Sequence, residues 1–269
     1  MLAEVSSGDP IPGVDPFTAS AARIYDYMLG GKDNYAVDRD VGDQLLANAP
    51  ISPWIARQNR RFLGRAVRYC AEQGVRQFLD IGSGLPTLEN VHEVAQRVDP
   101  ACRVVYVDND PVAVVHAQAL LTGGTNVAAI GGDLRKPEEI LAHETVRHLI
   151  DFSRPMVVLM VAILHFIRDS ENPAGVVARF VDEMAPGSYF VLSHATHDVR
   201  PESASRARDI YRRASSPLVT RTKQEIGELL HGLEPVDPGL VFTVEWRPPR
   251  EIPDPERSGL YAAVARKPG

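Results

Sequence analysis

The stretch that most constrains this chain is residues 78–84, where an apolar run ends in Asp80 and two glycines follow, one residue apart. A strand that ends in such a turn and continues as a helix presents free backbone N–H groups and allows a ligand to approach closely. The carboxylate at the strand tip suits a ligand with positive charge and repels a pyrophosphate. The turn therefore favours S-adenosylmethionine, which carries an ammonium and a sulfonium, over a nicotinamide or flavin dinucleotide.

The dinucleotide-binding fingerprint has glycines at the first, third and sixth positions of its turn. Gly82 and Gly84 occupy the first and third positions, but Thr87 stands at the sixth. Because the third glycine of the fingerprint lets the helix pack closely on the strand, its absence weakens the dinucleotide interpretation. A dehydrogenase remains the weaker alternative.

The chain after residue 75 alternates between strand and helix patterns. Strands are predicted over residues 75–81, 103–107, 126–130, 156–163 and 188–193, and helices over 88–97, 112–121, 137–149 and 173–184. This alternation indicates a parallel sheet with right-handed crossovers, whose ligand site lies at the carboxyl ends of the strands. In the tail we predict helices over 202–213 and 223–230, and a final antiparallel strand pair over 241–246 and 260–264.

Two more strands end in a carboxylate. Asp108, followed by Asn109, comes after the second strand, where an acidic side chain can accept both ribose hydroxyls of a nucleoside. Asp133 follows the third strand and can accept the exocyclic amine of an adenine, while Leu134 packs or offers its backbone. Either aspartate alone could be an ordinary helix cap, and for Asp110, which precedes a proline, the cap is the favoured interpretation.

Composition limits the function classes. The 269 residues are 44% hydrophobic with a net charge of -6, so one main domain is expected, with no overall basic field for nucleic acid or an anionic membrane. The N-terminus lacks signal-peptide character, and the longest apolar run is far too short to span a membrane, so we expect a cytoplasmic protein. Cys70 and Cys102 do not indicate a disulfide framework.

The segment before the first strand is helical in character. Residues 21–29 predict a helix that ends at Gly30 and Gly31, and this element could either close over the donor as a lid, with Tyr25 or Tyr27 as an apolar wall, or simply pack as a capped helix. A second helix over 53–71 carries five arginines, most of them expected on a solvated face. Arg60 is the exception, because its guanidinium could bind the carboxylate of the donor.

Methyl transfer to a hydroxyl needs a proton acceptor, and three histidines are candidates. His165, just past the fourth strand, is the predicted catalytic base, with His194 and His197 as runners-up. No third ligand accompanies the His194 and His197 pair, so no metal site is predicted. In the tail, Tyr211 and Trp246 could wall an aromatic acceptor pocket, although the tail could equally form a dimer surface.

The chain resembles the class I S-adenosylmethionine-dependent methyltransferases, and more closely a family of uncharacterised actinobacterial S-adenosyl methyltransferases. The closer resemblance rests on the segments AARIYDYMLGGKDNY (residues 21–35), NRRFL (59–63), DIGSGLPT (80–87), LHFI (164–167) and GLEPVDPG (232–239). It extends from about Phe17 to the end of the chain. Pro86 stands where many class I enzymes have a third glycine, a departure that matches the closer family.

The resemblance implies a Rossmann-like α/β fold with a seven-stranded, mostly parallel sheet, helices on both faces and an N-terminal helical extension. We expect a flexible N-terminus over residues 1–16, a helical lid over 17–72 and a domain that binds S-adenosylmethionine over 73–269. The expected donor site, from the resemblance and the residues together, comprises Tyr25, Arg60, Asp80, Gly82, Ser83, Gly84, Asp108, Asn109, Asp133 and Leu134.

Two functions of different class follow. The first is a methyltransferase that acts on oxygen or nitrogen of a small-molecule acceptor, without nucleic acid or membrane partners and with a homodimer as one arrangement. The second is a module that binds S-adenosylmethionine without chemistry, as a sensor or assembly partner.

Overall fold

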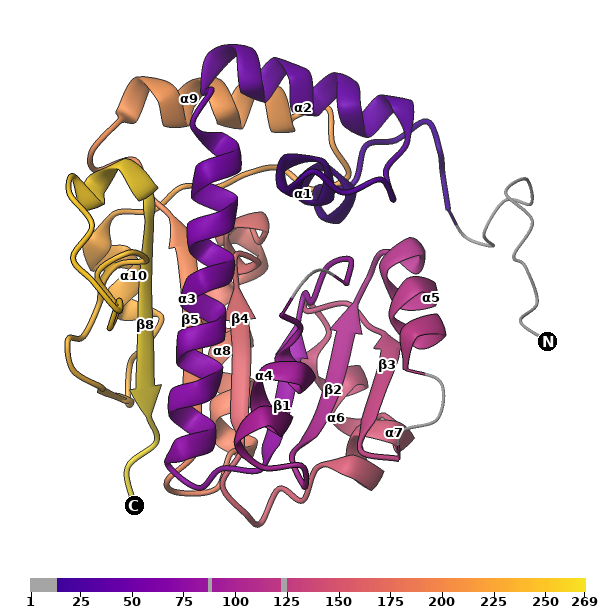
Figure 1. Cartoon of the computed structure of the whole chain (residues 1–269), viewed down its shortest axis with the longest axis vertical. Helices are drawn as coiled ribbons and strands as arrows, with labels where there is room; N and C mark the ends of the chain where they lie inside the picture. The colour runs from indigo at the N-terminus through magenta and orange to yellow at the C-terminus, as the bar shows by residue number, and fades with distance from the viewer. Residues whose placement is uncertain (1–13, 87–88, 122–124) are drawn as a thin grey trace.

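A single mixed sheet organises the molecule (Figure 1). The computed structural model describes residues 14–86, 89–121 and 125–269. Over these residues eight strands lie in the order β3-β2-β1-β4-β5-β8-β6, and β7 also pairs with β8. The strands are β1 (Gln77–Ile81), β2 (Arg103–Asp108), β3 (Val127–Gly131), β4 (Val157–Val161), β5 (Tyr189–Ala195), β6 (Glu234–Pro235), β7 (Val241–Phe242) and β8 (Leu260–Arg266).

The first five strands are parallel, and β8 runs antiparallel to β5, as predicted. The chain builds outward from β1 to β3 on one side and from β4 to β8 on the other, so the strand order reverses between β1 and β4. Such a reversal leaves a crevice at the carboxyl ends of the strands, because the connections from neighbouring strands leave in opposite directions. The topology therefore brings the predicted carboxylates to one end of the sheet.

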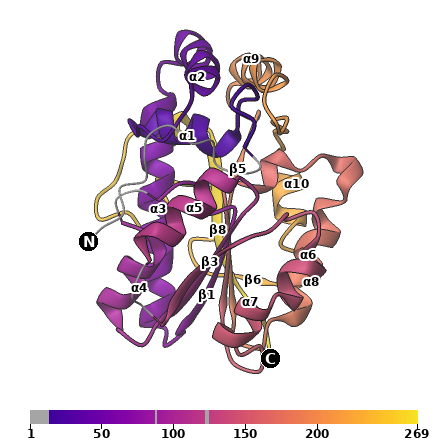
Figure 2. The same ribbon diagram turned by 90° about the vertical axis from the view of Figure 1, so that its right-hand side faces the viewer.

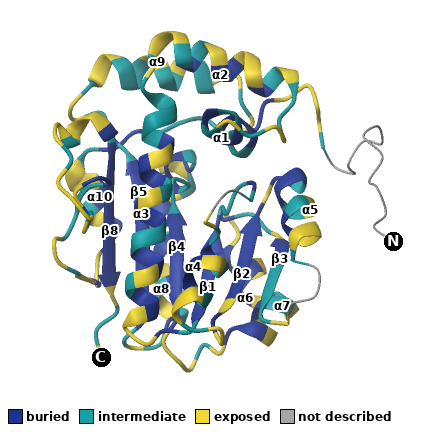
Figure 3. Ribbon diagram, viewed as in Figure 1, coloured by how far each residue is buried: buried dark blue, intermediate teal, exposed yellow. Residues whose placement is uncertain are grey.

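Helices cover both faces of the sheet, which Figure 2 shows edge-on. They are α1 (Ala21–Leu29), α2 (Ala36–Asn48), α3 (Ser52–Glu72), α4 (Val91–Val98), α5 (Pro111–Leu120), α6 (Pro137–Ala142), α7 (Glu144–Leu149), α8 (Pro173–Glu183), α9 (Pro201–Tyr211) and α10 (Lys223–Glu228). One core joins the sheet to α3, α4 and α5, and the other joins it to α6, α7, α8 and α10. The central strands of the sheet are almost wholly buried and β3 at its edge is partly buried, whereas the outer helix faces are exposed (Figure 3).

A cap lies over the carboxyl ends of the strands, formed by α1, α2 and α9 (Figure 1). Its small core combines Ile24 and Met28 of α1 and Val41 of α2 with Ala56 of α3, and Ile210 of α9 packs against it. The rest of α3 belongs to the sheet core, where Phe62 is fully buried. The cap therefore differs from the predicted lid over 17–72, because α3 is shared with the sheet and α9 comes from much later in the chain.

Several predicted boundaries differ from the structure. The helix expected over 137–149 breaks at His143, which has an extended backbone and whose Nδ1 accepts a hydrogen bond from Thr145 N, capping α7. The strand expected over 241–246 is reduced to β7, because the chain turns after Phe242. Most of the N-terminus predicted as flexible, and Thr87, lie outside the described residues.

Both cysteines are buried free thiols. Within the described ranges no helix combines the length and apolar character needed to cross a bilayer.

Candidate functional site

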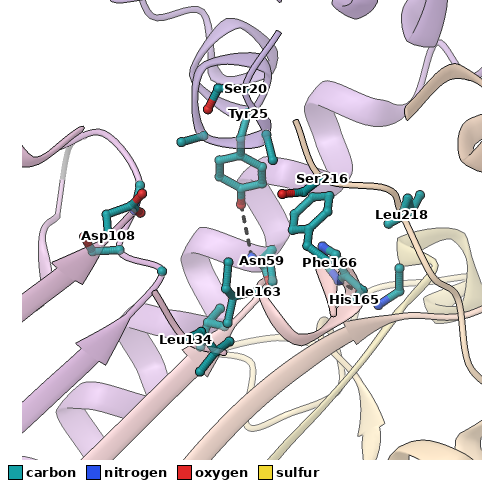
Figure 4. A pocket seen from close by; sticks show the side chains of 18 of the residues that line it. Ser20, Tyr25, Asn59, Asp108, Leu134, Ile163, His165, Phe166, Ser216 and Leu218 are labelled. Carbon is teal, nitrogen blue, oxygen red and sulfur yellow. Dashed lines mark hydrogen bonds between the residues drawn. The ribbon is translucent and has the colours of Figure 1, made fainter. Parts of the chain in front are cut away.

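A cavity of about 260 Å³ lies between the carboxyl ends of the strands and the cap. Figure 4 shows it from close by, with Asp108 and Leu134 on one side and His165, Phe166 and Leu218 on the other. All ten residues of the predicted donor site line this cavity, and so does His165. The fold thus brings together side chains that are up to 140 positions apart, from Tyr25 to His165.

The turn after β1 needs its glycines for two different reasons. Gly82 has φ +71°, and a Cβ atom there would overlap the side chain of Ile163, which follows β4. Gly84 has φ +67°, but a Cβ atom there would meet no atom of the described residues within 4 Å. Both residues adopt the left-handed backbone that favours glycine. The bare surface at Gly84 also leaves room for a ligand against the backbone.

Asp108 holds this turn in place. Its Oδ2 accepts a hydrogen bond from Gly84 N at 2.7 Å, and its Oδ1 accepts one from Asp110 N at 2.8 Å. Burial raises the pKa of Asp108 to about 6, although the backbone hydrogen bonds oppose that rise. Each carboxylate oxygen keeps a further acceptor site, so the side chain can still accept two neighbouring hydroxyl groups.

Asp80 and Arg60 line the same end of the cavity and keep spare binding capacity. Asp80 is 4% exposed, and burial raises its pKa to about 7, with Arg60 lowering it and Asp108 raising it further. Among the described residues the buried Nε of Arg60 has no hydrogen-bond partner, while its Nη2 donates to Glu89 O at 3.3 Å. An unpaired buried donor is costly unless a ligand satisfies it. The site can therefore hold a carboxylate at Arg60 and an ammonium at Asp80.

Asp133 is partly engaged by its neighbour. Arg135 Nε donates to Asp133 Oδ1 at 2.8 Å and to Oδ2 at 3.0 Å. Burial opposes ionisation, but the hydrogen bonds from Arg135 outweigh it and hold the pKa of Asp133 below its ordinary value. Leu134 is 6% exposed and forms an apolar wall beside it. This corner can therefore cover a flat ring and accept a hydrogen bond at the edge of that ring.

Tyr25 connects the cap to the sheet. Its hydroxyl donates to Ala56 O at 3.0 Å and accepts from Asn59 Nδ2 at 3.1 Å. Asn59 Oδ1 in turn accepts from Ser193 Oγ of β5 at 2.6 Å. Tyr27 instead packs on α2, where its hydroxyl donates to Asp43. Of the two tyrosines offered as a wall, Tyr25 is the one that lines the cavity.

The glycines that were predicted as a joint have a capping role. Gly30, with φ +87°, is the C-cap of α1, and Gly31 leaves space for the carboxylate of Asp26, which a Cβ atom would overlap. Asp26 also accepts hydrogen bonds from Asp33 N and Asn34 Nδ2. The turn is therefore a hydrogen-bonded cap.

His165 is not placed as a general base. Its Nδ1 accepts a hydrogen bond from Ala195 N at 3.2 Å, so the neutral ring carries its proton on Nε2 and has no free lone pair. Burial, with His194 and Arg221 nearby, holds the pKa of His165 well below its ordinary value. The sequence identified a cavity residue, but the role predicted for it disagrees with its hydrogen bonding.

The two alternative histidines are also engaged. Arg221 Nη1 lies 2.7 Å from His194 Nε2, and His194 Nδ1 lies 2.8 Å from Ala195 O. His197 Nδ1 lies 3.1 Å from Thr220 O. Arg221, which no sequence motif marks, also donates to Leu164 O, Ile167 O and Asp169 and so holds the loop after β4 in place.

Two further predictions are corrected. Trp246 does not line the cavity: it is fully buried beside Phe62 and Tyr69, whereas Tyr211 does line it. Among the arginines of α3, Arg65 is not on a solvated face, because its Nε and Nη2 donate to the carbonyls of Trp246 and Thr243.

The comparison with protein families decides the identity. The profile of a family described as S-adenosyl methyltransferase matches residues 9–268. The chain belongs to this S-adenosyl methyltransferase family. Its cofactor is S-adenosylmethionine, and the fold is the Rossmann-like class I methyltransferase fold, as predicted.

Two solved structures are similar to this methyltransferase over almost its whole length. A methyltransferase candidate from Thermobifida fusca is 40% identical, with a TM-score of 0.91, and the match covers 97% of this chain and 99% of that one. A DUF574 family protein from Streptomyces avermitilis is 40% identical with a TM-score of 0.90, covering 93% and 98% of the two chains. The N-methyltransferase NodS from Bradyrhizobium japonicum, solved with S-adenosyl-L-homocysteine, shares the fold at 15% identity and a TM-score of 0.51, covering 92% and 100%.

A curated relative gives a shorter match. An ornithine lipid N-methyltransferase from Singulisphaera acidiphila is 28% identical over 100 residues, which are 37% of this methyltransferase and 47% of the relative. The chain thus matches about half the length of that protein.

The cavity suits the cofactor of the methyltransferase family. The unpaired Arg60 Nε matches a carboxylate, the buried Asp80 matches an ammonium, and the spare acceptor sites of Asp108 match a ribose diol. The bare surface over Gly84 leaves room for the backbone contact that the glycine turn predicts. When bound, S-adenosylmethionine supplies an electrophilic methyl group on a sulfonium.

Donor affinity of the methyltransferase should depend on pH through Asp80. The raised pKa, about 7, leaves this carboxyl half protonated near neutrality in the free protein, while an ammonium binds the ionised form. Binding should therefore weaken by up to roughly tenfold per pH unit as the pH falls below about 7, and level off above it. Calorimetry between about pH 6 and about pH 8 measures this, and Asp80→Asn should flatten the profile. An equal slope in wild type and Asp80→Asn would assign the dependence to another group.

Proposed function

We propose that this methyltransferase transfers a methyl group to a nitrogen or oxygen atom of a small molecule held under the cap. The observation that carries the proposal is the extent of the cavity. It continues from the strand tips, where the donor residues gather, to a second part lined by Phe166, Tyr211 and Leu218. A donor alone leaves that second part without a use.

The chain's own residues would align the reactants and exclude water. Tyr25 and Met28 of the cap cover the cavity, and Ile163 forms part of its wall. Methyl transfer is an in-line displacement, so its rate depends on holding acceptor, methyl carbon and sulfur in a row in a site without competing water. In this proposal the cap opens to admit the two ligands and closes for transfer.

The test is a turnover screen of the full chain with isotope-labelled donor against candidate metabolites. Transfer of label to a small molecule, with release of S-adenosylhomocysteine, supports the proposal. Tight donor binding with no transfer to any metabolite would favour the alternative, a binding module that acts as a sensor or assembly partner.

The contacts of Asp108 give a single-residue prediction for donor binding. Asp108→Ala should weaken binding of S-adenosylmethionine by about 1.5 to 3 kcal/mol, because hydrogen bonds to a charged group are lost. Titration calorimetry measures the change, and circular dichroism checks that the variant folds. Asp40→Ala, which removes an exposed carboxylate of α2, is the matched control and should bind as wild type does. Unchanged affinity in folded Asp108→Ala would limit Asp108 to holding the turn.

A further inference from the structure

We propose that the acceptor is an uncharged aromatic molecule that is methylated on a nitrogen whose lone pair is free at neutral pH. This inference rests on the proposed function and narrows it. It follows from three properties of the part of the cavity that faces α9 and the loop after β4, which we call the acceptor side: its charge, its lack of a proton acceptor and its aromatic wall.

The acceptor side carries no charge among the residues the structure describes. Its wall consists of apolar and hydroxyl-bearing side chains, among them Phe166, Tyr211, Ser216 and Leu218, together with the neutral imidazole of His165. The charged lining residues gather instead at the tips of β1 to β3 and on the adjoining part of α3, and they are Arg60, Asp80, Asp108, Asp133 and Arg135. Burying an ionised group without a counter-charge is strongly unfavourable. A carboxylate, phosphate or ammonium group on the acceptor therefore has no partner there.

Within the part of the chain that the structure describes, the acceptor side also offers no group to take up a proton. The Nδ1 lone pair of His165 already accepts a hydrogen bond from Ala195 N. The hydroxyl of Tyr25 keeps its own proton, which it donates to Ala56 O. Burial raises the pKa of Tyr211 far above neutrality, so its hydroxyl stays protonated. An alcohol must lose its proton to become a good nucleophile, whereas a neutral nitrogen already has its lone pair. The wall thus selects nitrogen over a hydroxyl.

The remaining property is the aromatic wall. Phe166 lies between His165 and Tyr211, with ring centroids 4.5 Å and 5.5 Å away, respectively. Figure 4 shows Phe166 and Ser216 beside Tyr25 at the cavity. Aromatic rings associate with one another by stacked and edge-to-face contacts. A flat ring is therefore the acceptor shape that this wall fits best.

The reaction balances without a further reactant. The nitrogen lone pair forms the new N–C bond, the S–C bond breaks, and its electron pair stays on sulfur as the thioether. The positive charge passes from sulfur to nitrogen. A ring nitrogen keeps that charge, and an aryl amine afterwards releases a proton to water.

Probes of similar ring size test the inference. Isoquinoline and 2-aminonaphthalene carry a neutral nitrogen, 2-naphthol a hydroxyl, 2-naphthoate an anion and 2-naphthylmethylammonium a cation. Binding is measured by calorimetry on the complex with S-adenosylhomocysteine, and methylation by mass spectrometry with S-adenosylmethionine. We expect the neutral probes to bind at least tenfold more tightly than the ions, and only the nitrogen probes to be methylated.

Three results would overturn the inference: ions that bind as tightly as the neutral probes, naphthol methylated as fast as a nitrogen probe, or no methylation of either nitrogen probe. If the metabolite screen still finds turnover of another class of acceptor, the proposed function survives without the inference. If that screen is also empty, both fail.

A variant that adds charge gives an independent check. Leu218 is half-buried on the acceptor side. Leu218→Lys should tighten binding of 2-naphthoate at least tenfold, because the anion gains a counter-charge. Leu218→Met, which conserves volume and charge, is the matched control and should bind 2-naphthoate as weakly as the wild type does. If the lysine variant folds and still rejects naphthoate, charge is not what excludes anions.

Discussion

Replacing Arg23 with methionine is expected to lower the free energy of unfolding by about 3 to 5 kcal/mol, the cost of breaking a buried ion pair from one side. Arg23 is 3% exposed, and its Nε donates to Asp38 at 2.8 Å while its Nη1 donates to Asp110 at 3.1 Å. Its Nη2 also donates to Thr18 O. The change would leave two buried carboxylates without their common cation.

Urea unfolding at neutral pH measures this loss. Arg57→Met is the matched control, because Arg57 is an exposed arginine of α3 and should change stability little. The stability of Arg23→Lys should lie between those of Arg23→Met and Arg57→Met, since lysine keeps the charge but not the forked geometry that reaches both carboxylates. Equal stability of Arg23→Met and Arg57→Met would show that the ion pairs of Arg23 with Asp38 and Asp110 add nothing to the free energy of unfolding.

The second large effect is expected at Gly82. Gly82→Ala should destabilise the protein by about 2 to 5 kcal/mol, because a left-handed alanine costs about 1 to 2 kcal/mol and overpacking about 1 to 3 kcal/mol. The overlap is with Ile163, which lines the same cavity. The turn must move to relieve it, so donor binding should be lost as well.

Two variants separate the causes of that loss. Gly84→Ala has the same left-handed backbone but open space around its Cβ, so it should show only the conformational cost. Ile163→Ala removes the overlapping side chain. Gly82→Ala should therefore cost less stability in the Ile163→Ala background than it costs in the wild-type protein. Thermal unfolding without ligand compares them. If Gly82→Ala is no less stable than Gly84→Ala, the contact with Ile163 is unimportant.

The sheet and its ligand edge could be predicted from the sequence because they depend on local signals. Alternating strand and helix patterns indicated a parallel sheet, and a carboxylate at or just past the end of each of three strands marked Asp80, Asp108 and Asp133. Parallel strands end at one edge, so those residues had to meet. The cap could not be predicted in the same way, because α9 joins it through contacts between distant parts of the chain.

The role of His165 illustrates a second limit. The sequence placed it at a strand end, which is correct, but whether its ring can accept a proton depends on a hydrogen bond from Ala195 N, 30 residues away. Likewise, Trp246 was chosen for its aromatic ring, yet the carbonyl contacts of Arg65 hold that segment against α3. Neither the hydrogen bond to His165 nor the burial of Trp246 can be predicted from the neighbouring residues in the sequence.

The shared cap has a consequence for synthesis of the protein. Helices α1 and α2 depend on two later parts of the chain, on Asp110 for a buried charge partner and on α9 for apolar packing. Asp110 is translated before the middle of the chain, whereas α9 (Pro201–Tyr211) follows only after most of the chain has been translated. The N-terminal helices therefore cannot fold as an early unit, and until α9 emerges they expose an apolar surface on which a chaperone could act.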